Sequence, residues 1–247
     1  ELQGLNQNVI KLHAGDAVSG SLFFTLFKGE ADAALMNEVC FDAFALGNHE
    51  FNEGDAGLAK FLDFLNAGDC STPVLAANIK PEVGVSALTP NSATDYIQPY
   101  TVMQMDGMKI GVVGIDIVRK TKLSSSPDES TVFLDEAETA QKMVDELKAS
   151  GIDHIILLTH YGYGNELELA ASIDGADVII GGDGDDLIFG QEGDDILRGD
   201  EADDIAASYF DDDYFIDPSV NPDDVTDPDN VGDPGDGLDP SLIGDDN

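Results

Sequence analysis

Three short polar segments of the sequence carry side chains that could bind a metal ion. They contain Asp16, the pair Asn48 and His49, and His160. Each segment directly follows an apolar run that predicts a β-strand. The carboxyl ends of strands are where ligand sites assemble in open α/β sheets, so we expect these side chains to converge in one pocket. Oxygen and imidazole donors together suit a divalent transition metal such as Zn, Mn or Fe.

The elements that must position these residues alternate as in βαβ units. Apolar runs predict strands at residues 8–13, 42–46, 74–77, 101–105, 109–115, 154–158 and 177–180. Helical periodicity predicts helices at residues 22–39, 55–66, 135–150 and 165–171, and Gly151 is a stop signal for the third. The strands on either side of Asp106-Gly107 read as a hairpin. The expected fold class is therefore α/β, with a layered sheet and flanking helices.

Four sequence segments carry a family resemblance: HAGDAVSGSLFFTLFKGE, FDAFALGNHEFNEG, PVLAANI, and IILLTHYG followed by ADVIIGG. In their order and spacing, residues 1 to about 182 resemble the catalytic domain of 5′-nucleotidases, which are calcineurin-like metallophosphoesterases. GNHE together with GD and TH is a specific combination, whereas each motif alone is weak. The resemblance implies a metallophosphoesterase fold that hydrolyses a small phosphorylated substrate such as a nucleotide.

The resemblance also implies roles for single residues. Asp16 looks like the carboxylate that bridges two metals, and Asn48 and His160 look like ligands of the second metal. His49 would stabilise the phosphoryl transition state or protonate the leaving oxygen. Asn52 stands where an Asp often partners the catalytic His, and it is a weaker partner because it carries no charge. Taken alone, Asp16 could be a turn or helix-capping residue, and His160 an ordinary strand-end histidine.

The sequence departs from the family pattern at both ends of the domain. The family's first strand carries an Asp-x-His motif for the first metal, and the given chain begins after it. We therefore expect a fragment with an incomplete dinuclear site, unless another chain or segment supplies that strand. The family's nucleoside-binding domain is missing as well. Phosphatase activity of the chain alone should be absent or very weak, because truncated ligand sets lose metal affinity.

The family motif GGHSH, which gives one His to each metal, is also altered. Here Gly181 and Gly182 lead into Asp183, Gly184 and Asp185. Asp183 and Asp185 hold the register of the two histidines and could be replacement metal ligands. The repeat described next accounts for the same aspartates without that role.

From residue 181 the sequence repeats every nine residues, as GGDGDDLIF, GQEGDDILR and a degraded GDEADDIAA. These units resemble RTX calcium-binding β-roll repeats. Glycines such as Gly184 and Gly193 permit the tight turns, and Asp186 and Asp195 offer hard oxygen ligands for calcium. Two good repeats are fewer than the roughly three that a stable roll needs, so a solvated acidic loop is the alternative.

Negative charge is distributed unevenly along the chain. Residues 1–180 carry 27 acidic and 10 basic side chains, and residues 181–247 carry 23 acidic and one basic, for a total of −39. Such acidity repels nucleic acid and favours calcium and other cations as partners. We expect an N-terminally incomplete metallophosphoesterase domain at 1–180, RTX-like repeats at 181–207 and an acidic Asp/Pro/Gly-rich tail at 208–247.

The remaining features concern location. No run of 18 apolar residues exists, so no membrane span is expected, and the polar start contains no signal peptide. Cys40 and Cys70 each precede a predicted strand, so both should lie at the amino edge of neighbouring parallel strands. A disulfide between them is plausible if the protein is exported. We expect a secreted, periplasmic or cell-surface location.

Two functions compete at this point. The first is a metal-dependent phosphoester hydrolase of the 5′-nucleotidase type. The alternative is a non-catalytic extracellular calcium-binding or assembly module with a degenerate phosphoesterase fold. A metal ion beside Asp16, Asn48 and His160 would favour the first.

Calcium should order residues 181–207, because cations cancel charge between adjacent turns that otherwise repel one another. Circular dichroism of this region should change on adding calcium and return on adding a chelator. A spectrum that ignores calcium would mean that the repeat interpretation is wrong.

Overall fold

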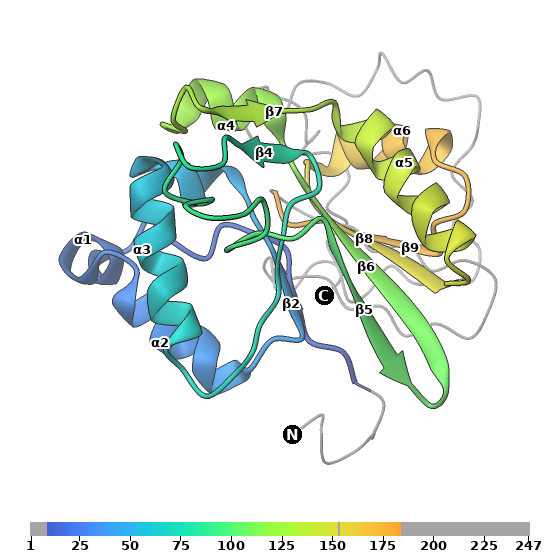
Figure 1. Ribbon diagram of the computed structural model, residues 1–247, viewed down its shortest axis with the longest axis horizontal. Helices are drawn as coiled ribbons and strands as arrows, with labels where there is room; N and C mark the ends of the chain where they lie inside the picture. The colour runs from blue at the N-terminus through green and yellow to red at the C-terminus, as the bar shows by residue number, and fades with distance from the viewer. Residues whose placement is uncertain (1–8, 153, 184–247) are drawn as a thin grey trace, which may run out of the picture. The chain divides into compact units, whose positions relative to one another are not determined.

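The computed structural model describes residues 9–152 and 154–183 as two β-sheets that pack face to face, with helices on both outer sides (Figure 1). The first sheet is parallel, in the order Leu12–His13 (β1), Ala43–Ala45 (β2), Val74–Leu75 (β3). The second sheet has the order Tyr100–Met105 (β5), Met108–Asp116 (β6), His154–His160 (β8), Val178–Ile180 (β9). In it only β5 runs antiparallel to its neighbour. A separate antiparallel pair joins Ile79–Pro81 (β4) to Thr131–Phe133 (β7).

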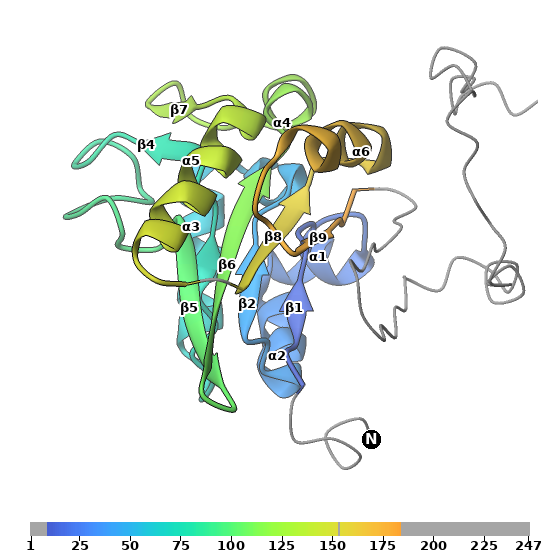
Figure 2. The ribbon, with the colours of Figure 1, turned by 90° about the vertical axis from the view of Figure 1, so that its right-hand side faces the viewer.

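Helices cover both outer faces of the sandwich (Figure 2). They are Leu22–Phe27 (α1), Glu30–Val39 (α2), Gly54–Asn66 (α3), Val118–Ser124 (α4), Glu136–Ala149 (α5) and Tyr163–Ser172 (α6), with a short 3-10 helix at Asn48–Phe51 (η2). Helices α2 and α3 pack on the first sheet, and α5 and α6 pack on the second. None of the helices in the described part of the chain is long and apolar enough to cross a membrane.

The period-two alternation of the strands explains these layers. In β8, Ile155 and Leu157 face α5 and α6, while Leu158 faces the first sheet. The two sheets approach each other closely at Gly114, where an added Cβ would lie 2.4 Å from the carbonyl oxygen of Leu75. Only glycine permits this close approach of the sheets next to the carboxyl ends of β6 and β8.

The α/β fold class with a layered sheet and flanking helices is confirmed, and so is the hairpin. Met105 pairs with Met108 across a two-residue loop. Both loop residues have positive φ, 47° at Asp106 and 83° at Gly107, which is the conformation that such tight hairpins require. The predicted stop of α5 is also present, because Gly151 adopts a φ of 75° directly after the helix.

The predicted single helix over residues 22–39 is wrong. The chain turns between α1 and α2 at Lys28 and Gly29, which have φ values of 53° and 90°. An added Cβ at Gly29 would lie 3.0 Å from the ring of Phe61 on α3. The break lets α2 pack on α3, whereas α1 buries none of its residues.

The elements β4, β7 and α4 were not predicted from the sequence. The loops around β4 and β7 are tied to the start of α3 by Asp55, a buried carboxylate. It accepts hydrogen bonds from the hydroxyls of Ser86 and Thr131 and from the backbone N–H of Asp128. These contacts span more than 30 residues of sequence, so no local pattern predicts them.

Cys40 and Cys70 form a disulfide at the amino ends of the neighbouring strands β2 and β3, and their Cα atoms are 5.5 Å apart. The bond closes a loop with a sequence separation of 30 residues. This loop contains η2 and α3 and therefore the GNHE segment.

Removing the disulfide with the double variant Cys40→Ala, Cys70→Ala should lower the free energy of unfolding by about 3 kcal/mol, because the unfolded chain regains the entropy of an open loop. Urea unfolding of the variant and the parent would measure the difference. A thiol assay that finds two free thiols in the native, unreduced parent would contradict the bond.

Candidate metal centre

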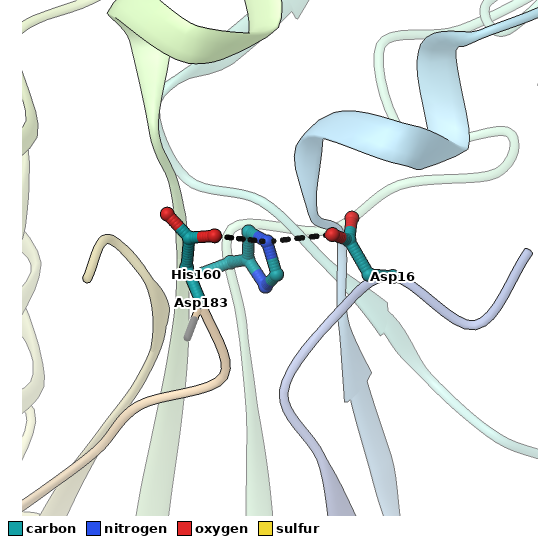
Figure 3. Close-up of side chains that lie close together, drawn as sticks. All are labelled: Asp16, His160 and Asp183. Carbon is teal, nitrogen blue, oxygen red and sulfur yellow. Dashed lines mark ion pairs between the residues drawn. The ribbon is translucent and has the colours of Figure 1, made fainter. Parts of the chain in front are cut away.

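Asp16, His160 and Asp183 meet in one cluster (Figure 3), and one ligand atom from each lies within 4.8 Å of the other two. Nε2 of His160 is 3.1 Å from Oδ2 of Asp16 and 3.7 Å from Oδ1 of Asp183. Asp16 follows β1, His160 ends β8 and Asp183 follows β9. The cluster therefore joins both sheets at their carboxyl edge.

Two glycines make room for this cluster. A Cβ added at Gly47 would lie 2.5 Å from Oδ1 of Asp16, and one at Gly15 would lie 2.7 Å from Nδ1 of His160. Gly15 also has a φ of 102°, which side chains rarely adopt. Any larger residue at Gly15 or Gly47 would thus occupy the space that Asp16 and His160 need.

The buried ring of His160 is oriented by the chain itself. Its Nδ1 lies 2.8 Å from the carbonyl oxygen of Ala14, which can only accept, so Nδ1 carries the proton. Nε2 then faces the two carboxylates. Burial lowers the pKa of His160, but the hydrogen bond and charge of Asp16 outweigh it and raise this pKa to about 9. An Nε2 held between two carboxylates is placed for a cation, whether a proton or a metal ion.

The backbone of Asp16 is strained, with a φ of 55°. Its Oδ1 accepts the backbone N–H of His49 at 2.8 Å. Although burial opposes ionisation, the hydrogen bond and charge of His160 hold the pKa of Asp16 below its usual value. Asp16 is thus held as a carboxylate whose Oδ1 is fixed by the backbone N–H of His49.

Glu50 holds the two loops of the cluster together. Its Oε2 accepts the backbone N–H of Gly47 at 2.7 Å and of Asp16 at 2.9 Å, and its Oε1 accepts that of Val18 at 3.3 Å. Burial, with the nearby charge of Asp16, raises the pKa of Glu50 to about 7. The side chain points its oxygens at backbone groups, which makes it a brace for the loops.

Asn48 is fully buried at the start of η2. Within the described residues, neither its Oδ1 nor its Nδ2 has a hydrogen-bond partner. A buried unpaired amide is costly, and a metal ion that accepts its oxygen would remove part of that cost. The predicted ligand Asn48 therefore fits a metal beside Asp16.

His49 lies at the open side of the cluster, with 40% of its side chain exposed and Nε2 4.0 Å from Oδ2 of Asp16. Its Nδ1 lies 2.8 Å from Nδ2 of Asn52 and 3.2 Å from Oγ of Ser19. Ser125 in turn donates to Oδ1 of Asn52 at 3.0 Å and to the carbonyl oxygen of Asn48. The structure thus places Asn52 beside His49, where its amide can orient the ring.

The sequence reasoning missed Asp116, which pairs in register with His160 on the neighbouring strand. Asp116 is fully buried, and burial raises its pKa well above the usual value. Its Oδ2 accepts from Oγ1 of Thr121 at 2.7 Å, and its Oδ1 has no hydrogen-bond partner among the described residues. Its position directly after the predicted strand 109–115 was a signal of the same kind as that of Asp16.

The sequence reasoning also missed Lys120, which forms an ion pair with Asp183 from α4. No sequence signal marked it. The predicted replacement ligand Asp185 and the predicted calcium residues Gly184, Asp186, Gly193 and Asp195 lie outside the described residues.

The sequence is 41% identical to a probable 5′-nucleotidase of Treponema pallidum over 181 residues, which are 73% of this chain and 29% of that protein. The solved NAD nucleotidase of Haemophilus influenzae is 44% identical, with a TM-score of 0.67 over 74% of this chain and 34% of that one. The calcineurin-like phosphoesterase YfkN of Bacillus subtilis, at 24% identity, has a TM-score of 0.56 over 73% of this chain and 59% of that one and supports the fold alone. The chain spans about 30% of the length of the first relative.

A family described as the RTX calcium-binding nonapeptide repeat (4 copies) matches residues 173–206. The fold of the described residues is thus that of the calcineurin-like phosphoesterases. Within that class, the chain combines a segment related to the 5′-nucleotidases with an RTX calcium-binding repeat.

Replacing Glu50 by Gln should destabilise the fold by about 2 kcal/mol, because the new amide group turns a donor toward at least one buried backbone N–H. Urea unfolding is the measurement. Glu53→Gln is the matched control: Glu53 is a partly exposed partner of Lys28, so its change should stay below about 1 kcal/mol. Equal effects of the two variants would show that Glu50 does not brace the loops.

Proposed function

We propose that this chain carries a metal-dependent phosphoesterase centre of the 5′-nucleotidase type. The centre would hold a divalent metal ion between Asp16, Asn48, His160 and Asp183. The observation that carries this proposal is the convergence of Asp16, His160 and Asp183 within 4.8 Å around a histidine whose Nε2 faces both carboxylates. The buried, unpaired amide of Asn48 supports it.

Asp183 stands at a position where the family resemblance implies a histidine. With Asp183 the donor set has two carboxylates, one amide oxygen and one imidazole. Carboxylate and amide oxygens suit Mn²⁺, whereas imidazole also suits Zn²⁺ and Fe²⁺. We therefore expect Mn²⁺ to bind more readily here than in a centre richer in histidine.

The proposed chemistry is hydrolysis of a phosphomonoester, with a nucleotide as the substrate class because the relatives are named 5′-nucleotidases. A bound divalent ion would neutralise phosphoryl oxygens and lower the pKa of a water ligand. His49, the exposed histidine of the cluster, is placed to donate a proton to the leaving oxygen. Asn52 and Ser125 would hold its ring in position.

A second function, calcium binding, is favoured by the repeat match at residues 173–206. We propose that the repeats at 181–207 bind calcium and that residues 208–247 form an acidic tail, after a phosphoesterase domain at 1–180. The disulfide supports an exported location, because such bonds persist in oxidising compartments.

The proposal predicts that Mn²⁺ binds to the full chain when calcium has first saturated the repeats. Asp16→Asn should weaken this binding at least about tenfold, because it removes a charged ligand. Asp145→Asn, on the exposed side of α5, is the control and should bind as the parent does. Mn²⁺ titration followed by electron paramagnetic resonance would measure both.

Chelator-sensitive hydrolysis of a nucleotide monophosphate, even if slow, should accompany the metal and be lost in Asp16→Asn. A parent chain that takes up no Mn²⁺ at millimolar concentration would rule out the centre. A chain that binds calcium but no Mn²⁺, and that hydrolyses no phosphomonoester, would favour the non-catalytic calcium-binding module.

A further inference from the structure

Lys120 reaches the cluster of Asp16, His160 and Asp183 from α4, a helix with no role in the predicted site. Its ammonium group pairs with Oδ1 of Asp183, and the same oxygen lies 3.7 Å from Nε2 of His160. The lysine side chain is 42% exposed, whereas that of Asp183 is 14% exposed. One face of the ammonium group thus meets the cluster, and the other meets solvent, from which a substrate would approach.

The backbone at Lys120 is held in place by the neighbouring residue, Thr121. Thr121 donates its hydroxyl to Oδ2 of Asp116 at 2.7 Å, and Asp116 is the register partner of His160. This bond ties α4 to the end of β6 beside the cluster. The flexible stem of Lys120 then moves its charge over a short range around a fixed point, as phosphate-binding lysines do.

The charge of the cluster explains why a cation at the position of Lys120 would help to bind a phosphate group. The carboxylates of Asp16 and Asp183 together cancel one divalent cation. A phosphomonoester dianion would then meet a centre with no net positive charge. A dinuclear centre overcomes this with a second metal ion, and here, among the residues that the structure describes, Lys120 brings a partly exposed ammonium group to the cluster.

We propose that Lys120 is a phosphate-binding residue of this centre and supplies to a phosphoryl oxygen the positive charge that a second metal ion would otherwise supply. The proposal rests on the proposed function, because it needs a metal at Asp16, Asn48, His160 and Asp183. Oδ1 of Asp183, the oxygen that faces Nε2 of His160, is also the oxygen that pairs with Lys120, so the lysine would lie next to a phosphoryl group bound at this centre.

The test separates phosphate binding from metal binding. Calorimetry on the full chain, with calcium present, gives the dissociation constant of Mn²⁺ and then that of inorganic phosphate for the Mn²⁺-loaded protein. Lys120→Met, which keeps the length and loses the charge, should weaken phosphate binding at least about tenfold. Lys120→Arg should stay within about threefold of the parent, because the charge is kept.

Lys122→Met is the matched control on the same helix, since Lys122 lies over the ring of Phe133 with Nζ 5.4 Å from its centre. It should bind phosphate and Mn²⁺ as the parent does. In Lys120→Met the affinity for Mn²⁺ should be unchanged or higher, because Asp183 loses a competing cation.

Two outcomes would overturn the proposal. Unchanged phosphate affinity in Lys120→Met with normal Mn²⁺ binding leaves the metal centre standing and removes the role of Lys120. Loss of Mn²⁺ binding in Lys120→Met would mean that the lysine only positions Asp183. If the parent itself binds no Mn²⁺, the proposed function fails as well, so the two failures are distinguishable.

Discussion

The described structure depends on one buried carboxylate that joins two loops far apart in sequence. Glu50 accepts backbone N–H groups from Asp16, Val18 and Gly47, and so holds the loop after β1 against the loop after β2. A carboxylate suits this task because all its partners are donors. It also holds the strained backbone of Asp16 in place. The two loops are therefore held together by protein contacts before any metal binds, which is what preorganisation of a ligand set requires.

Asp183 had two explanations in the sequence, as part of a nine-residue repeat and as a substitute for a metal-binding histidine. The structure puts it 3.7 Å from Nε2 of His160, and the repeat match at residues 173–206 includes it as well. The two explanations are compatible. The last strand of the phosphoesterase sheet, Val178–Ile180, also lies inside the matched segment, so the two sequence patterns overlap at their junction.

Local patterns predicted the parts of this fold that local chemistry determines. The apolar strands, the hairpin turn at Asp106-Gly107 and the end of α5 at Gly151 follow from periodicity and backbone preference. The break between α1 and α2 could not be predicted in this way, because it depends on the close contact of Gly29 with Phe61 on α3. The strand pair β4 and β7 joins Lys80 to Val132 across a long stretch of chain, which no local pattern records.

The candidate site shows the same division. Asp16, Asn48, His49 and His160 were found because each follows a recognisable strand within a known motif. Asp116 follows a strand without such a motif. Lys120 lies on a helix that the sequence did not predict, and its partner Asp183 is 63 residues away. Contacts of that range become visible only once the sheets are assembled.

The helix α4 touches the candidate centre through several side chains, from Thr121 to Asp116, from Lys120 to Asp183, and from Ser125 just after it to the carbonyl oxygen of Asn48. Leu123, on the outer side of the same helix, is 75% exposed and takes no part in these contacts. The chain contains no tryptophan. A tryptophan introduced at position 123 would therefore be the sole indole of the protein, and its fluorescence would report optically on the order of the helix that the cluster holds in place.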